Sequence, residues 1–363
     1  MTTTLPEAPE SEAEILRRAR ATLSDRLPPS WTMTAQQERP PGYGRADAVW
    51  RITAPDGRAA TFVVAAKRFV DGRDVPSVLN QLETYIGQDD RATGLLVARY
   101  LSPQVRASLT ENGTSYVDAT GNMNVNVASP GLLMSDRGAD GDPWRGPGRP
   151  RGTLKGAPAA RVIRALADIA GPWSIRELVD VAGVSTGAGY RVIDFLEREG
   201  LAERLERGSM KVPRWDKALR RWSEDYGFVR DSQVTRWIAP RGLGALTERL
   251  ASIDPATYAV TGTLAAASWS AYAPARSAMI YTRNADTLAA AAGLKPADAG
   301  ANVLLAEPSS DVPFLRTLTN ESGVQIAAPT QVVVDLMTGP GRSPQEAEEL
   351  LQWMMSNEQS WRT

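Results

Sequence analysis

The spacing of apolar residues divides the chain into three stretches. In the first, helical periodicity alternates with short apolar runs that are typical of strands. The predicted elements are a helix over Glu12–Leu27, strands over Ala48–Ala54 and Ala59–Ala66, a helix over Val75–Ile86, the strand TGLLVARYL, the helix SPQVRASLTENG and the strand-turn-strand segment SYVDATGNMNVNV. This pattern predicts an α/β domain over residues 12–134, preceded by a disordered tail over residues 1–11.

The second stretch, residues 157–228, has the spacing of short helices. The segments PAARVIRALADIAGPW, SIRELVDVAGV and STGAGYRVIDFLEREG are predicted helices, and two strand-like runs follow on either side of Gly208 and Ser209. Between the second and third helix, Gly183 suits a tight bend and Ser185 suits the N-cap of the next helix. Three short helices and a hairpin predict a winged helix-turn-helix domain. The order of its elements resembles that of IclR-type bacterial regulators.

The third stretch, residues 240–363, returns to alternating strands and helices, with strands at YAVTG, SAMIYT, NVLLAE and GVQIAAP and a final pair of helices. Residues 135–156, which are rich in Gly, Pro and Arg, are predicted to be a linker between the first two domains. The chain is therefore expected to be a multidomain protein of the α/β plus α class.

Composition excludes several kinds of chemistry. The chain has no Cys and no His, which removes disulfides, thiolate nucleophiles, zinc fingers and the commonest general base. We expect no enzymatic activity, cofactor or bound metal. No apolar run approaches the roughly 18 residues of a membrane span, so we expect a cytoplasmic protein without a membrane partner.

Charge is concentrated in the middle of the chain. Residues 145–221 contain 16 Lys and Arg against 9 Asp and Glu, a net charge of +7, whereas the whole chain carries −1 and the rest therefore carries −8. A basic segment between acidic flanks indicates that the middle of the chain meets a polyanion, and the predicted fold makes double-stranded DNA the expected partner.

The third helix of the winged helix-turn-helix is the expected reading helix. Its inward face is predicted to carry Val192, Ile193 and Leu196 with their neighbour Phe195. This leaves small, hydroxyl and basic residues on or near the outer face, namely Thr186, Ala188, Gly189, Tyr190 and Arg191. The candidate DNA-binding residues are Arg176, Ser185, Thr186, Gly189, Tyr190 and Arg191 from the helices, Arg204, Arg207 and Lys211 from the hairpin, and Arg145, Arg149 and Arg151 from the linker. A homodimer on paired half-sites is expected. The alternative is a helical domain that mediates protein contacts and has a solvated basic face.

The linker contains the sequence WRGPGRPRGT. Its Gly148-Arg149-Pro150 core resembles an AT-hook, in which an extended peptide lies in the minor groove of A·T-rich DNA. The alternative is a plain joint, and the two interpretations are compatible.

The first domain resembles the PD-(D/E)xK nuclease superfamily. Asp47 matches the first carboxylate of that motif, Lys67 matches the lysine, and Ala65 occupies the position of the second acid. Because the missing acid would help to hold Mg²⁺, we expect an inactive relative, with Asp47 and Lys67 as vestigial catalytic residues. A metal-dependent nuclease in defence or repair is the alternative function, with Glu83 as a possible replacement acid. The polar turn in VDATGNMNV suits a structural role or a binding role.

The third domain resembles a minimal nucleotidyltransferase. Gly262 and Thr263 open a helix directly after a strand, but the strand AMIYTRN carries no acid before Asp286, so transferase activity is not expected. Together with the winged helix and the C-terminal segments TQVVVDL, GPGR and EAEELL, residues 157–363 resemble the AbiEi antitoxins of type IV toxin–antitoxin systems. The resemblance implies a transcriptional regulator that controls its own promoter, and it also implies a cognate toxin as a partner. An antitoxin that opposes a nucleotidyltransferase-type toxin is a further alternative.

Overall fold

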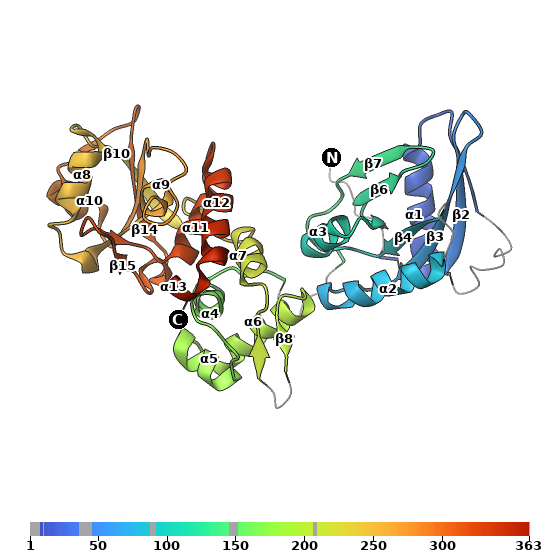
Figure 1. Ribbon diagram of the computed structural model, residues 1–363, viewed down its shortest axis with the longest axis horizontal. Coiled ribbons are helices and arrows are strands. Elements are labelled where there is room, and N and C mark those ends of the chain that lie inside the picture. Colours follow the sequence, from blue (N-terminus) through green and yellow to red (C-terminus); the bar gives the residue numbers. More distant parts are fainter. Residues whose placement is uncertain are drawn as a thin grey trace. The chain divides into compact units, whose positions relative to one another are not determined.

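The computed structural model describes residues 8–9, 11–35, 46–87, 92–144, 152–205 and 209–362. The chain forms two compact units (Figure 1). Unit 1 comprises Met1–Arg149 with Glu197–Gly200, and unit 2 comprises Pro150–Leu196 and Leu201–Thr363. The chain contains both α-helices and β-sheets, which confirms a mixed α/β architecture.

Unit 1 contains a sheet of seven strands in sequential order. The strands are β1 (Thr32–Ala35), β2 (Ala48–Thr53), β3 (Ala59–Lys67), β4 (Ala92–Ala98), β5 (Ser115–Asp118), β6 (Met123–Val127) and β7 (Leu132–Asp136). The three central strands β3, β4 and β5 are parallel to one another, and each flanking strand pairs antiparallel with its neighbour. The short strands β1 and β7 extend the sheet beyond the predicted elements.

Helices cover both faces of this sheet. The helix α1 (Glu12–Arg26) buries Ile15, Ala19 and Leu23 in the same cluster as Phe62 and Val64 of β3. The 3₁₀ helix η1 (Gly72–Asp74), α2 (Val75–Ile86) and α3 (Pro103–Glu111) border the opposite face. Ala65, next to Val64 in the same strand, belongs to the α2 and α3 cluster because successive side chains of a strand point to opposite faces.

The predicted linker of residues 135–156 is packed at both ends. Residues 137–144 lie on unit 1, where Arg99 Nη2 donates to Asp142 Oδ2 at 2.6 Å and Tyr100 OH donates to the Asp140 carbonyl at 2.7 Å. In unit 2, the Leu154 amide donates to Asp225 Oδ2 at 2.7 Å, and the Leu154 side chain is buried. The prediction was wrong at these ends because a polar composition does not reveal hydrogen-bond partners that come from distant parts of the chain.

The N-terminal part of unit 2 contains four helices and a hairpin. The helices are α4 (Ala157–Asp168), α5 (Ile175–Ala182), α6 (Thr186–Arg198) and α7 (Trp215–Ser223). Between α6 and α7, β8 (Glu203–Arg204) pairs antiparallel with β9 (Met210–Lys211), and an isolated bridge joins Trp173 to Met210. These helices and strands follow the predicted order, although the strands are shorter than the sequence indicated.

The C-terminal part of unit 2 is built on a second sheet of seven strands. Its order is β13 (Lys295–Pro296), β10 (Ser232–Ile238), β14 (Val303–Pro308), β12 (Ala278–Thr282), β11 (Tyr258–Thr261), β16 (Gln325–Ile326) and β15 (Leu318–Thr319). The helices are α8 (Gly242–Leu250), α9 (Gly262–Ala266), α10 (Ala285–Ala292), α11 (Pro329–Met337), α12 (Ser343–Ser356) and α13 (Glu358–Trp361), with 3₁₀ helices η3 (Pro255–Thr257) and η4 (Val312–Phe314). The sequence pattern did not reveal β10, β13 or β15.

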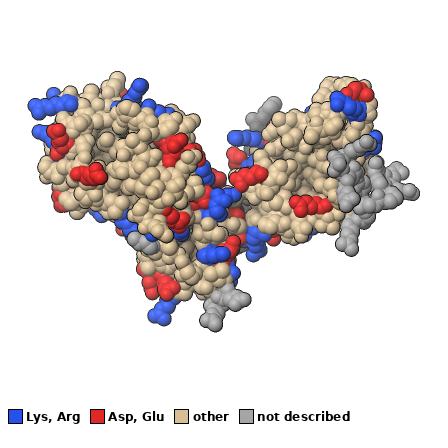
Figure 2. All heavy atoms as spheres, in the orientation of Figure 1, with Lys and Arg blue, Asp and Glu red and all other residues tan. Residues whose placement is uncertain are grey.

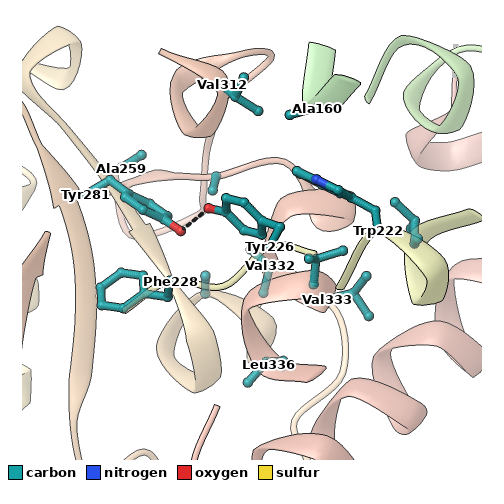
Figure 3. Packing of buried hydrophobic residues seen from close by; sticks show 14 of the residues in the cluster. Ala160, Trp222, Tyr226, Phe228, Ala259, Tyr281, Val312, Val332, Val333 and Leu336 are labelled. Atoms are coloured by element: carbon teal, nitrogen blue, oxygen red, sulfur yellow. Dashed lines mark hydrogen bonds between the residues drawn. The ribbon is translucent and has the colours of Figure 1, made fainter. Parts of the chain in front are cut away.

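A single hydrophobic cluster runs through all of unit 2. It joins residues of α4 and α7 to residues of the second sheet and α11, and Figure 3 shows Trp222, Tyr226 and Tyr281 packed among them. The helix α4 is buried on nearly all sides, from Ala159 to Asp168 apart from Arg161, which is the behaviour of a central helix. The sequence predicted separate domains over residues 157–228 and 240–363, whereas these segments share one core in the structure.

Candidate nucleic-acid interface

The turn between α5 and α6 sets the direction of α6. Gly183 adopts a left-handed conformation with φ 61° and ψ 43°, which favours glycine because other residues meet a Cβ clash there. Ser185 Oγ accepts a hydrogen bond from the Ala188 amide at 3.3 Å, and this bond satisfies a free donor at the start of α6. Both predictions for this turn are confirmed.

The inner face of α6 packs as predicted, with Val192, Ile193, Phe195 and Leu196 buried. Gly189 differs from the prediction: it was expected on the outer face, but it is buried. A Cβ at Gly189 would lie 2.5 Å from Val179 Cγ2, so this glycine allows α6 to approach α5 closely. Ala188, also expected outside, is 5% exposed. The helical spacing misplaced Gly189 because Val179 of α5 packs directly against it.

Three of the predicted residues lie together on the outer face of α6. Thr186 and Arg191 are exposed, and Tyr190 exposes 44% of its surface. Arg176 is exposed in the first turn of α5, whose N-cap Ser174 forms a capping box with Glu177. The side chains of Thr186, Tyr190 and Arg191 therefore remain accessible to a ligand after α5 and α6 have packed.

The basic residues of this face differ in their ion pairs. Arg204 Nη2 lies 3.9 Å from Asp194 Oδ1, and Lys211 Nζ lies 3.1 Å from Glu203 Oε2. Within the part of the chain that the structure describes, no carboxylate pairs with Arg176 or Arg191. Figure 2 shows positive and negative side chains interspersed around α5, so single guanidinium groups, and not a uniformly basic surface, distinguish this face.

Four predicted DNA-binding residues fall outside the described residues. They are Arg145, Arg149 and Arg151 of the predicted linker and Arg207 of the predicted hairpin. Their proposed contacts with DNA stay predictions.

A buried polar network, which the sequence analysis did not predict, joins α4 to α11. Arg164, which is fully buried, donates from Nη1 to Gln331 Oε1 at 3.1 Å and from Nη2 to the Leu315 carbonyl at 2.8 Å. It also pairs with Asp168, one turn further along α4, at 3.1 Å. Arg316 Nη1 donates to the same Asp168 carboxylate at 2.8 Å. The signals that could have indicated this network are the polar residues within two largely apolar helices, Arg164 and Asp168 in α4 and Gln331 and Asp335 in α11.

The network continues to Asp335 through hydroxyl groups. Thr261 Oγ1 and Tyr281 OH donate to the two carboxylate oxygens at 2.6 and 2.8 Å, and Gln331 Nε2 donates at 3.0 Å. Tyr226 OH lies 2.8 Å from Tyr281 OH (Figure 3). Complete burial raises the pKa of Asp335 to about 7, because the loss of hydration outweighs the three hydrogen bonds. Burial likewise raises the pKa of Tyr226 and Tyr281 above the ordinary range.

The predicted vestigial nuclease residues lie at the ends of neighbouring strands. Asp47 precedes β2, and its Oδ2 accepts the Ala66 amide at 2.8 Å, while Lys67 ends β3. Ala65, at the position of the second acid, is fully buried. Among the described residues, no three Asp and Glu side chains are grouped as metal ligands. In this geometry the Asp47 carboxylate holds the end of β3.

The polar turn of VDATGNMNV is organised around Asp118, which is fully buried. Its carboxylate accepts the amides of Leu101, Thr120 and Asn122, together with the Thr120 hydroxyl and the Asn122 side-chain amide. Five donors satisfy both oxygens, so the geometry favours the structural interpretation of this turn.

The nucleotidyltransferase-like segment is also filled by packing. Gly262 has φ 66°, and a Cβ there would lie 2.9 Å from Met279 Sδ. Thr263 Oγ1 donates to Glu346, whose other carboxylate oxygen accepts Arg342 Nε at 2.8 Å. Thr263 therefore fastens α9 to α12, and the GPGR turn contributes Arg342 to the same cluster.

Comparison with known proteins gives a match over part of unit 2. The fold of unit 2 combines short helices and a hairpin with an α/β sheet. Residues 211–355 match a family described as "Transcriptional regulator, AbiEi antitoxin, Type IV TA system". The match runs from β9 to α12 and supports the resemblance to AbiEi antitoxins; it does not include unit 1 or α4 to α6. No curated protein and no solved structure matched the chain. No helix of the described residues is long and apolar enough to cross a membrane.

Proposed function

We propose that this protein is a sequence-specific regulator of transcription that binds double-stranded DNA through α5, α6 and the β8–β9 hairpin as a winged helix-turn-helix. The observation that carries the proposal is the outer face of α6, where Tyr190 and Arg191 are exposed beside a tight, capped turn. Such a helix suits the major groove, and the basic residues of the hairpin suit the phosphates.

The family match supports the same role from a different part of the chain. The matched family is described as a transcriptional regulator and antitoxin, and the match covers the segment that shares a core with α4. Control of its own promoter and binding as a homodimer to paired half-sites belong to this proposal, because regulators of this kind read symmetric sites.

The test is a titration of DNA from the region upstream of the gene with the full-length protein at several salt concentrations. We expect retention of the fragment with a negative slope of log affinity against log salt, because bound cations displace counterions from phosphates. Replacing Tyr190 and Arg191 together by Ala should abolish specific binding. A wild-type protein that retains no DNA at low salt would refute the proposal.

A second function, antitoxin activity, is favoured by the description of the matched family. We propose that the toxin would be of the nucleotidyltransferase type. The test is expression of the neighbouring gene in a host cell with and without this protein. Growth arrest that this protein relieves would support the antitoxin function, and relief should persist in the Tyr190 and Arg191 double variant if the two functions are separate. Arrest that continues unchanged would count against it.

A further inference from the structure

Arg191, like Arg176, differs in its surroundings from Arg204 and Lys211 of the hairpin. Arg204 and Lys211 each face a carboxylate of the same chain, whereas no carboxylate pairs with Arg191 among the described residues. A guanidinium without an internal anion keeps its five donors for a ligand. Arg191 can therefore bind without first breaking an ion pair.

The direction of the Arg191 side chain is given by its contact with Gly187, one turn earlier in α6. The Arg191 Nη1 atom lies 3.6 Å from the position that a Cβ of Gly187 would occupy. The guanidinium thus lies back over the first turn of α6, as long helical side chains do. Gly187 leaves this space open, and the two residues that follow it, Ala188 and Gly189, are small and buried.

The first turn of α6 is also the slimmest part of the helix. Residues 186–189 are Thr, Gly, Ala and Gly, and the close packing of Gly189 on Val179 fixes which side of this turn faces outward. A slim first turn lets the helix backbone approach the floor of a groove, and the N-terminal residues of a reading helix are those that reach base edges.

From these contacts we propose that Arg191 reads a guanine in the major groove, while Arg176 contacts a phosphate. This inference rests on the proposed function and specifies the kind of operator that it requires, namely one with a fixed G·C pair in each half-site. A planar guanidinium can donate to guanine O6 and N7 at once, which is the commonest specific contact of arginine with DNA. Arg176 lies in the first turn of α5, the helix that precedes the reading helix, where backbone contacts are usual.

The experiment selects binding sites from a randomised duplex library with the full-length protein and its variants Arg191→Lys, Arg191→Ala and Arg176→Ala. The wild type should select a site with an invariant guanine. Arg191→Lys keeps the positive charge but loses the planar pair of donors that can contact O6 and N7 of guanine together. It should therefore reduce the preference for guanine over the other bases at that position by about 10-fold to 100-fold and leave the salt slope unchanged. Arg176→Ala should keep the same site, weaken binding to all sequences and lower the salt slope by about one.

The outcomes separate the inference from the proposed function. If Arg191→Lys selects the wild-type site with undiminished preference, or if the lost position is not a guanine, then Arg191 does not read the base and the inference is refuted while DNA binding stands. If the wild type selects no site and shows no salt-dependent binding, the proposed function itself fails. Circular dichroism of each variant verifies that the helices are intact.

Discussion

Arg164 of α4 and Gln331 of α11 are joined by a hydrogen bond of 3.1 Å although 167 residues separate them in the chain. Arg164 also holds Asp168 and the carbonyls of Val312 and Leu315, so one side chain ties α4 to two distant segments. The first helix of the proposed DNA-binding region is therefore tied to α11 and to the segment of η4.

Arg164→Ala should destabilise unit 2 by about 3–5 kcal/mol. It removes one of the cations that neutralise the buried Asp168 carboxylate, and it removes the guanidinium that donates to Gln331 Oε1. The matched control is Arg161→Ala, which breaks the pair of a more exposed arginine with Asp311 and should cost about 1 kcal/mol or less. Urea unfolding followed by tryptophan fluorescence measures both. Equal effects of the two substitutions would contradict the central role of Arg164.

The stability of unit 2 should fall as pH rises from about 4 to about 7, as far as Asp335 is concerned. The pKa of Asp335 is about 7 in the folded chain and ordinarily 3.8, so over this window the unfolded chain has lost a proton that the folded chain still binds. Below about pH 4 Asp335 is protonated in both the folded and the unfolded chain. Above about pH 7 it is ionised in both, and the free energy of unfolding stays lowered by the full cost of burying the carboxylate. Asp335→Asn should remove this pH dependence, which amounts to up to about 4 kcal/mol.

The measurement for Asp335 is a series of urea unfolding curves between pH 4 and pH 8 for the wild type, Asp335→Asn and Glu248→Gln. Glu248 is an exposed acid in α8, and its substitution should leave the pH profile of the wild type unchanged. A profile of Asp335→Asn that parallels the wild type across this range would show that Asp335 is ionised throughout.

Gly189→Ala should destabilise the α5–α6 pair by about 1–3 kcal/mol, because the new methyl group would meet Val179 Cγ2 at 2.5 Å. The double variant with Val179→Ala should recover part of this loss, since the clash is with that side chain. Gly187→Ala is the matched control: its methyl group makes an ordinary contact at 3.6 Å, so helix propensity should stabilise it by up to about 1 kcal/mol. Thermal unfolding distinguishes these variants, and a neutral Gly189→Ala would disprove the close approach.

The full-length protein should not cleave plasmid DNA with Mg²⁺ or Mn²⁺, because the position of the second acid is occupied by the buried Ala65. Agarose electrophoresis of supercoiled plasmid tests this expectation. Cleavage that Lys67→Ala abolishes and Arg68→Ala retains would reverse it and assign the nuclease function to unit 1.

Local pattern was enough to predict most helices and strands, the start of α6 and the main buried positions of α6. The bend at Gly183 and the cap at Ser185 depend on backbone conformation and hydrogen bonds within a few residues, so the sequence determines them directly. The buried positions Val192, Ile193 and Leu196 follow from helical period alone. The strands β10, β13 and β15 were missed because their stability depends on pairing with partners elsewhere in the sheet.

By itself, the sequence determined the alternation of helices and strands, the outer position of Tyr190 and Arg191, and the absence of Cys and His chemistry. Only the tertiary structure decided that Gly189 faces α5 and that residues 137–144 pack within unit 1. It also decided that α4 shares one hydrophobic core with the second sheet and α11. The physical reason is the same in each case. The spacing of apolar residues and their secondary-structure propensity predict which face of a helix or strand is buried. Burial of a second face of the same helix or strand requires contacts from residues that are distant in the chain.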